Sequence, residues 1–124
     1  MKIGLDYWQV CSHYPEYFRV LAELWRTCDD NRVYILSAVG QDRVGTVQAA
    51  VEALNIPHNG VFEVVYDDVR QALALKLAKC LELGITVFYD DREDVCRVLN
   101  RHGILALRVL RKDNSTYDLG AEQR

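Results

Sequence analysis

Short apolar runs alternate along the chain with longer stretches in which apolar residues recur every three or four positions. The short runs are rich in β-branched and aromatic residues, which suits strands buried on both faces of a sheet. The longer stretches have the period of amphipathic helices. This alternation predicts an α/β domain with a parallel sheet. The five predicted strands are Lys2–Asp6, Val33–Ser37, Val61–Tyr66, Ile85–Tyr89 and Ile104–Val109.

Four helices are predicted between these strands, each from an apolar stripe. The first begins near Pro15, because proline suits a first helical position. Gly84 and Gly103 follow the last two helices, where a left-handed C-terminal cap is favoured. The stripes are Phe18, Leu21, Trp25 and Cys28 in the first helix, Val44, Val47, Val51 and Leu54 in the second, Leu73, Leu77, Cys80 and Leu81 in the third, and Val95 and Leu99 in the fourth.

The chain has 124 residues, a length that suits one hydrophobic core and no second domain. We expect one domain over residues 1–110 and a flexible tail over 111–124, because the tail has no apolar period. The net charge of −3, without a cluster of Lys and Arg, argues against nucleic acid as a partner. No apolar run is long enough to cross or target a membrane. Four widely spaced cysteines predict reduced thiols and a cytoplasmic location.

Acidic residues gather where the predicted strands end, and in parallel α/β sheets ligands bind beyond the carboxyl ends of the strands. One feature repeats: VVYDD at 64–68 and VFYDD at 87–91 are each an apolar strand followed by an acidic pair and a helix. Either pair alone is typical of helix capping, since Asp68 with Gln71, and Asp91 with Asp94, have the spacing of an N-cap and the third helical residue. The strand-end residues are Asp6, Ser37, Asp67 or Asp68, and Asp90 with Asp91.

The order of these groups resembles the haloacid dehalogenase (HAD) superfamily of hydrolases, over about residues 2–109. The segment GITVFYDDREDV is the most specific match. The matching residues are Asp6 for the nucleophile, Ser37 for the second motif, Lys76 for the third motif with Lys79 as a substitute, and Asp90 and Asp91 for the acidic fourth motif. The resemblance implies a Rossmann-like domain with five parallel strands in the order 5-4-1-2-3, which sends Asp67 and Asp68 to the sheet edge.

The implied strand order makes Asp6 and Asp90 neighbours, within roughly 5 Å of each other. Two such carboxylates repel by about 3 kcal/mol at an effective dielectric of about 20, and Asp91 adds to the repulsion. A proton or a cation must therefore lie there, and Mg²⁺ is the natural candidate because it prefers oxygen ligands. The resemblance implies that Asp6, the backbone carbonyl of Trp8, Asp90 and Asp91 hold the metal.

The chemistry implied by the resemblance is hydrolysis of a phosphorylated substrate through a covalent intermediate. Asp6 would attack, and the metal and Lys76 would compensate the negative charge of the carboxylate and the transferred group. Ser37 would donate a hydrogen bond to a phosphoryl oxygen.

The chain departs from the family at Trp8, where its phosphatases carry a second Asp as general acid and base. Loss of a positioned acid typically lowers the rate by about 10²–10⁴. The Gly and Thr usual in this loop are also missing from YWQVCSHYP. Three interpretations stay open: a phosphatase that takes its proton from elsewhere, for example from His13; a dehalogenase-like branch; or a catalytically degenerate domain that acts as a binding module.

Short connections between the predicted strands leave no room for a cap domain. An open site excludes water poorly and admits large substrates. This favours a macromolecular phosphate, or a site closed by a second subunit, over a small metabolite.

Overall fold

The computed structural model describes residues 1–112 and confirms an α/β domain with one parallel sheet. The five strands are arranged as β3-β2-β1-β4-β5, which is the expected order. β1 lies in the middle, with Leu5 opposite Ile35 on one side and Tyr89 on the other. The strands are β1 (Lys2–Leu5), β2 (Arg32–Gly40), β3 (Gly60–Tyr66), β4 (Val87–Asp90) and β5 (Leu105–Arg108).

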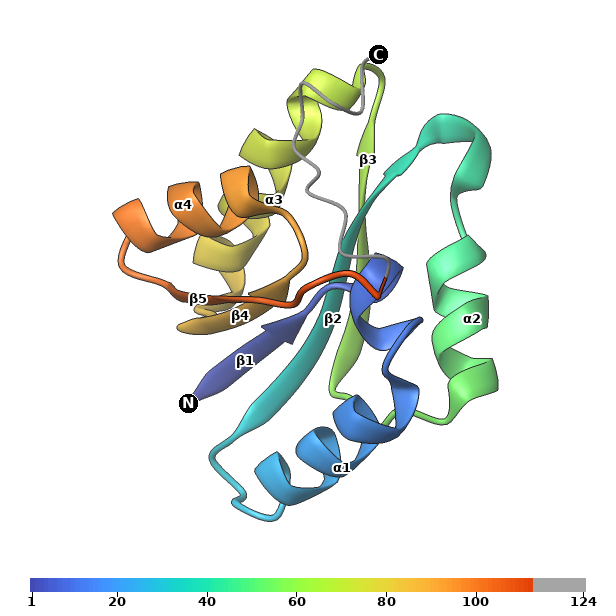
Figure 1. Ribbon diagram of the computed structural model, residues 1–124, viewed down its shortest axis with the longest axis vertical. Helices are drawn as coiled ribbons and strands as arrows, with labels where there is room; N and C mark the ends of the chain where they lie inside the picture. Colours follow the sequence, from blue (N-terminus) through green and yellow to red (C-terminus); the bar gives the residue numbers. More distant parts are fainter. Residues whose placement is uncertain (113–124) are drawn as a thin grey trace.

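Helices cover both faces of the sheet, α1 and α2 on one face and α3 and α4 on the other (Figure 1). The chain moves outward from β1 to β3, then returns to the opposite side of β1 for β4 and β5. The strand order therefore reverses between β1 and β4, where ligands of such sheets bind. The helices are α1 (Pro15–Trp25), α2 (Thr46–Leu54), α3 (Ala72–Leu83) and α4 (Glu93–Arg101), with short turns η1 (Tyr7–Cys11), η2 (Gln41–Arg43) and η3 (Val69–Gln71).

Each face of the sheet has its own hydrophobic core. Ile3 and Leu5 point toward α1 and α2, and the fully buried Phe88 lies in the core under α3 and α4. Gly4 faces this second core, because side chains alternate along a strand. A Cβ at Gly4 would collide with the Phe88 ring, so the close packing of β1 against β4 requires glycine.

Four local predictions are wrong at the ends of elements. Ser37 does not end its strand, because β2 continues to Gly40 and pairs with β3 throughout. Val44 precedes α2 and is exposed, since the left-handed Gly45 turns the chain before the helix begins. Cys28 and Leu81 are exposed rather than part of their stripes, and α1 has already ended at Trp25.

The N-cap of α4 is Arg92, so Asp91 does not have the capping role that its spacing to Asp94 left open. Capping is confirmed at the other acidic pair, where Asp68 and Gln71 form a capping box. Gly84 and Gly103 have the expected left-handed conformation.

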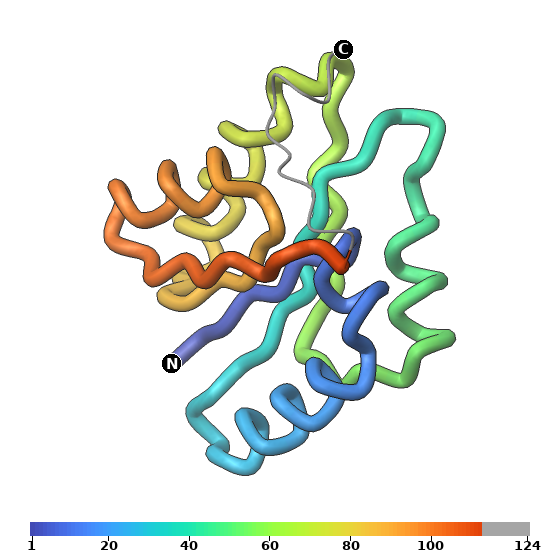
Figure 2. Tube along the Cα trace, viewed as in Figure 1, coloured from blue at the N-terminus to red at the C-terminus, as the bar shows by residue number. Residues whose placement is uncertain are grey.

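After β5 the chain runs past the carboxyl ends of the strands and lies beside the turn that follows β1 (Figure 2). The Tyr14 hydroxyl donates to the Leu110 carbonyl at 3.0 Å, which fixes this approach. Arg111, predicted as the first tail residue, pairs with Asp91. The rest of the predicted tail, from residue 113, lies outside the described residues. Within residues 1–112, every helix is too short or too polar to cross a membrane.

Candidate active site

Asp6 follows the last residue of β1, at the point where the strand order reverses. Its backbone N–H donates to the Tyr89 carbonyl at 3.0 Å, which continues the pairing with β4 by one residue. The chain then enters η1, where the Ser12 N–H bonds the Tyr7 carbonyl at 2.9 Å and Gln9 is left-handed with φ 65°. This tight turn keeps the Tyr7 backbone N–H next to the Asp6 carboxylate. The sequence predicts only an ordinary loop for these residues.

The Asp6 carboxylate is fixed from behind by two donors. Its Oδ1 accepts from the Tyr7 N–H at 2.9 Å and from the Ser37 hydroxyl at 2.6 Å. Ser37 is fully buried, and its Oγ also lies 2.9 Å from the Tyr7 nitrogen. The structure thus brings Ser37 to Asp6, where it orients the carboxylate. Direct contact of Ser37 with a phosphoryl oxygen stays a prediction.

Lys76 reaches the same point from α3. Its ammonium lies 2.6 Å from Asp90 Oδ2 and 3.4 Å from Asp6 Oδ2, and all three side chains are buried. Lys79, the substitute considered from the sequence, instead pairs with Glu82 at 2.6 Å. The structure therefore selects Lys76 as the lysine beside Asp6.

The acidic pair at the end of β4 is held by a backbone N–H of the following turn and by arginine side chains from β5 and the residues after it. Asp90 Oδ1 accepts the Arg92 N–H at 3.0 Å. Asp91 Oδ2 accepts from Arg111 Nε at 2.7 Å and lies 2.6 Å from Arg111 Nη2. The Arg108 side chain donates to the Asp91 backbone carbonyl at 3.3 Å. β5 and the residues after it thus position the pair.

Asp6, Asp90 and Asp91 together form a cluster that fits a metal ion. One carboxylate oxygen of each lies within 4.8 Å of the other two, and all three residues are buried. Oxygen ligands from carboxylates are what Mg²⁺ prefers. Trp8 borders the cavity described below, and a role for its backbone carbonyl stays a prediction.

The directions of the pKa shifts in this cluster indicate that the nearby cations do not fully balance its three carboxylates. Burial raises the pKa of Asp6 to about 7; Lys76 opposes this rise, and Asp90 and Asp91 add to it. Burial and the neighbouring Asp90 also raise the pKa of Asp91, although Arg111 opposes them. Burial by itself would lower the pKa of Lys76, but the facing carboxylates raise it. A further cation would relieve this repulsion.

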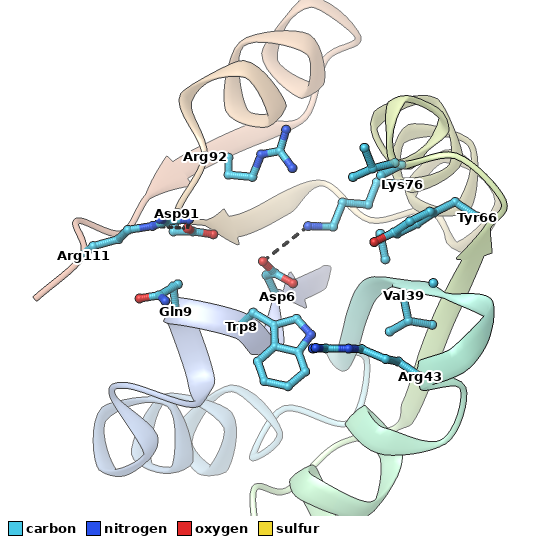
Figure 3. Close-up of a pocket in the computed structure, with 14 residues that line it drawn as sticks. Asp6, Trp8, Gln9, Val39, Arg43, Tyr66, Lys76, Asp91, Arg92 and Arg111 are labelled. Atoms are coloured by element: carbon cyan, nitrogen blue, oxygen red, sulfur yellow. Dashed lines mark hydrogen bonds and ion pairs between the residues drawn. The ribbon is translucent and has the colours of Figure 1, made fainter. Parts of the chain in front are cut away.

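Above the cluster lies a cavity of about 460 Å³ (Figure 3). Among the described residues that line it, four are cationic and two, Asp6 and Asp91, are acidic. The cavity therefore suits an anionic ligand larger than a bare phosphate. The lining residues are Asp6, Trp8, Gln9, Ala38, Val39, Gly40, Arg43, Tyr66, Val69, Ala72, Lys76, Asp91, Arg92 and Arg111.

Sequence reasoning missed most of the lining residues, and four of these carry a charge or a hydroxyl: Arg43, Tyr66, Arg92 and Arg111. Arg92 and Tyr66 could have been found, because one follows the acidic pair of β4 and the other ends β3. Arg43 and Arg111 carry no local signal, since only the folded chain brings η2 and the segment after β5 to the cavity.

Some residues considered from the sequence do not line this cavity. His13 is absent from its lining, and its Nδ1 lies 2.9 Å from the Ser12 hydroxyl. Asp67 and Asp68 lie at the outer strand β3, at the edge of the sheet. Asp90 is fully buried and does not line the cavity, but it accepts a hydrogen bond from the lining residue Lys76.

Comparison of the sequence with known proteins identifies no family for this chain. No family model and no curated protein matches the chain. The geometry of the charged groups is therefore the basis on which a function can be assigned.

Proposed function

We propose that the protein is a Mg²⁺-dependent hydrolase of phosphorylated substrates in which Asp6 is the nucleophile. The observation that carries the proposal is the meeting of three buried carboxylates and Lys76 at the base of a cavity with further cations on its walls. A carboxylate nucleophile, a metal and fixed cations together serve phosphoryl transfer, because this reaction depends on positioning and on compensation of negative charge.

Asp6, Asp90 and Asp91 would hold the metal, with the Trp8 carbonyl as a fourth ligand. Bound Mg²⁺ would supply Lewis-acid stabilisation of the phosphoryl oxygens. The Tyr7 N–H and the Ser37 hydroxyl orient Asp6 for attack.

Lys76 is placed to offset negative charge between Asp6 and Asp90. Arg43, Arg92 and Arg111 stand on the cavity wall, where they favour a doubly charged phosphoryl group over the single charge of a haloacid. These placements support the HAD-type hydrolase suggested by the order of the motifs, and favour its phosphatase branch over its dehalogenase branch.

The substrate phosphate can belong to a large molecule. Among the described residues, β1 and α1 are joined only by η1 and a few further residues, so no cap domain is inserted there. We propose a macromolecular phosphate, or closure of the site by a second copy of the chain, in a cytoplasmic protein that binds neither nucleic acid nor membranes.

A binding module is the second candidate, and the position of Trp8 favours it. Trp8 is 41% exposed and stands at the cavity where the resemblance requires an acidic residue. Such a module would keep the metal and the phosphate pocket without turnover.

Two measurements test the proposal. The first is calorimetry of Mg²⁺ with beryllofluoride, which mimics a phosphorylated carboxylate, and the second is Mg²⁺-dependent hydrolysis of 4-nitrophenyl phosphate. Asp6→Asn should abolish beryllofluoride binding and lower turnover on the order of 10³-fold or more. The matched control is Asp68→Asn, which makes the same change at the sheet edge and should leave both measurements unchanged.

Each outcome separates the candidates. Binding together with turnover, both lost in Asp6→Asn, supports the hydrolase. Binding without turnover in the wild type supports the binding module. Turnover that persists in Asp6→Asn would show that Asp6 is not the nucleophile.

A further inference from the structure

The departing oxygen of the substrate needs a proton, and this requirement rests on the proposed function. A leaving alkoxide or phenoxide is a poor leaving group unless an acid protonates it as its bond to phosphorus breaks. The position at which the resemblance implies an acidic residue for this role holds Trp8, whose indole N–H donates a hydrogen bond but does not transfer its proton. The acid must therefore be another group at the cavity.

Few cavity groups can supply a proton. Arginine keeps its proton, which excludes Arg43, Arg92 and Arg111. Asp6 is the nucleophile, and Asp91 is bound to Arg111. Among the described lining residues, Lys76 and Tyr66 remain as groups with a transferable proton.

Lys76 lies on the wrong side of the reaction. Its ammonium is buried between Asp90 and Asp6, next to the attacking carboxylate. In-line displacement puts the leaving oxygen on the far side of phosphorus from the nucleophile. The acid must therefore lie across the cavity from Asp6, with room for the phosphoryl group between them.

Tyr66 stands in that position. It ends β3 and pairs with Gly40, three residues beyond Ser37 along β2, so its backbone lies about 10 Å farther along the strand direction than the serine that touches Asp6. A Cβ at Gly40 would come no closer than 3.8 Å to the Tyr66 ring, an ordinary contact distance, so the ring lies directly beside β2 at this residue. Figure 3 shows the hydroxyl pointing into the cavity, toward the side where Lys76 and Asp6 meet.

We propose that Tyr66 is the general acid for the leaving group. In the first step an oxygen of Asp6 bonds to phosphorus, the bond from phosphorus to the leaving oxygen breaks, and that oxygen takes the Tyr66 hydroxyl proton. In the second step a water oxygen bonds to phosphorus and gives a proton to the Tyr66 phenolate. The bond from phosphorus to Asp6 then breaks, and the carboxylate and the phenol are both restored.

The test is how the effect of Tyr66→Phe depends on the leaving group. Phenyl phosphate needs the acid more than 4-nitrophenyl phosphate, because phenol is the weaker acid and its anion leaves less readily. We expect kcat/KM for phenyl phosphate to fall by about 10²–10⁴, and for 4-nitrophenyl phosphate by about 10-fold or less. Binding of Mg²⁺ with beryllofluoride should persist, since that complex has no leaving group.

The matched control is Tyr34→Phe, which removes a hydroxyl from a tyrosine in β2 that packs against Phe62 outside the cavity lining. It should change both substrates equally and little. Equal losses on both substrates in Tyr66→Phe, or no loss on either, would overturn the role of Tyr66 while leaving Asp6 as the nucleophile. A wild type without turnover on either substrate would instead overturn the proposed hydrolase, and this role with it.

Discussion

A strand followed by an acidic pair occurs twice in the chain, as VVYDD at 64–68 and as VFYDD at 87–91. The two copies have nearly the same sequence but opposite electrostatics. The first ends the edge strand β3, and the second ends β4, next to the central strand. Both pairs precede helical turns, so local sequence gives no reason to treat them differently.

At the edge, Asp68 is a capping residue in contact with solvent. Its side chain is 42% exposed, accepts the Arg70 N–H at 2.9 Å and pairs with the Arg70 guanidinium. Hydrogen bonds from the Arg70 side chain and then from its backbone lower the pKa of Asp68 to about 2. Folding therefore favours the ionised form of Asp68.

Next to the central strand, the second pair is forced against Asp6. Asp90 and Asp91 are buried, and their charges add to the burial that raises the pKa of Asp6. Folding therefore disfavours ionisation of Asp6, and a metal or a proton must compensate. The comparison shows that strand order, rather than local sequence, converts a capping motif into a candidate catalytic centre.

The largest effect should come from removing the buried cation. Lys76→Met leaves Asp6 and Asp90 without their shared ammonium, and we expect a loss of about 3–5 kcal/mol in the free energy of unfolding without divalent metal. Denaturant unfolding in EDTA measures this loss, and added Mg²⁺ should recover part of it. Lys79→Met, on the same helix, is the control and should cost far less. Equal stability of the two variants would contradict the charge cluster described above.

The next effect is the pH dependence of Asp6→Asn. The pKa of Asp6 is about 7 in the folded protein against 3.8 in the reference state, so the folded state holds the extra proton between these values. Wild-type stability should therefore fall as the pH rises from about 4 to 7, and stay level above that.

Asparagine carries no such charge, so without metal Asp6→Asn should be more stable than the wild type by about 2–4 kcal/mol at pH 8. The gap should close toward pH 4. Unfolding curves at several pH values in EDTA provide the measurement. A gap that does not change with pH would show that Asp6 ionises freely in the folded protein.

The smallest effect is expected at Asp68, at the edge of the sheet, where the substitution should destabilise the protein rather than stabilise it. Asp68→Asn keeps a capping side chain but loses the charge that faces Arg70, so Tm at pH 7 should fall by only about 3 °C or less. Because folding lowers the pKa of Asp68, its stabilising contribution is present above about pH 4 and is lost as the pH falls toward 2. The difference from wild type should therefore shrink between pH 5 and pH 3. A difference that grows in this range would contradict the contrast between the two pairs.

The sequence by itself determined the alternation of strands and helices, the left-handed glycine caps at Gly84 and Gly103, and the capping box at Asp68. These features depend on periodicity and on contacts between residues a few positions apart, which the sequence displays directly. Asp6, Lys76 and Asp90 were also foreseeable, because each occupies a recognisable place at a strand end or in a helix.

Only the tertiary structure decided what surrounds these residues. It placed Ser37 behind Asp6, brought Arg43 and Arg111 to the cavity, turned Tyr66 toward it and left His13 outside. Each of these placements depends on which strands lie side by side and how far each strand runs. Those are long-range contacts between segments distant in the chain, and neither local propensity nor hydrophobic period encodes them.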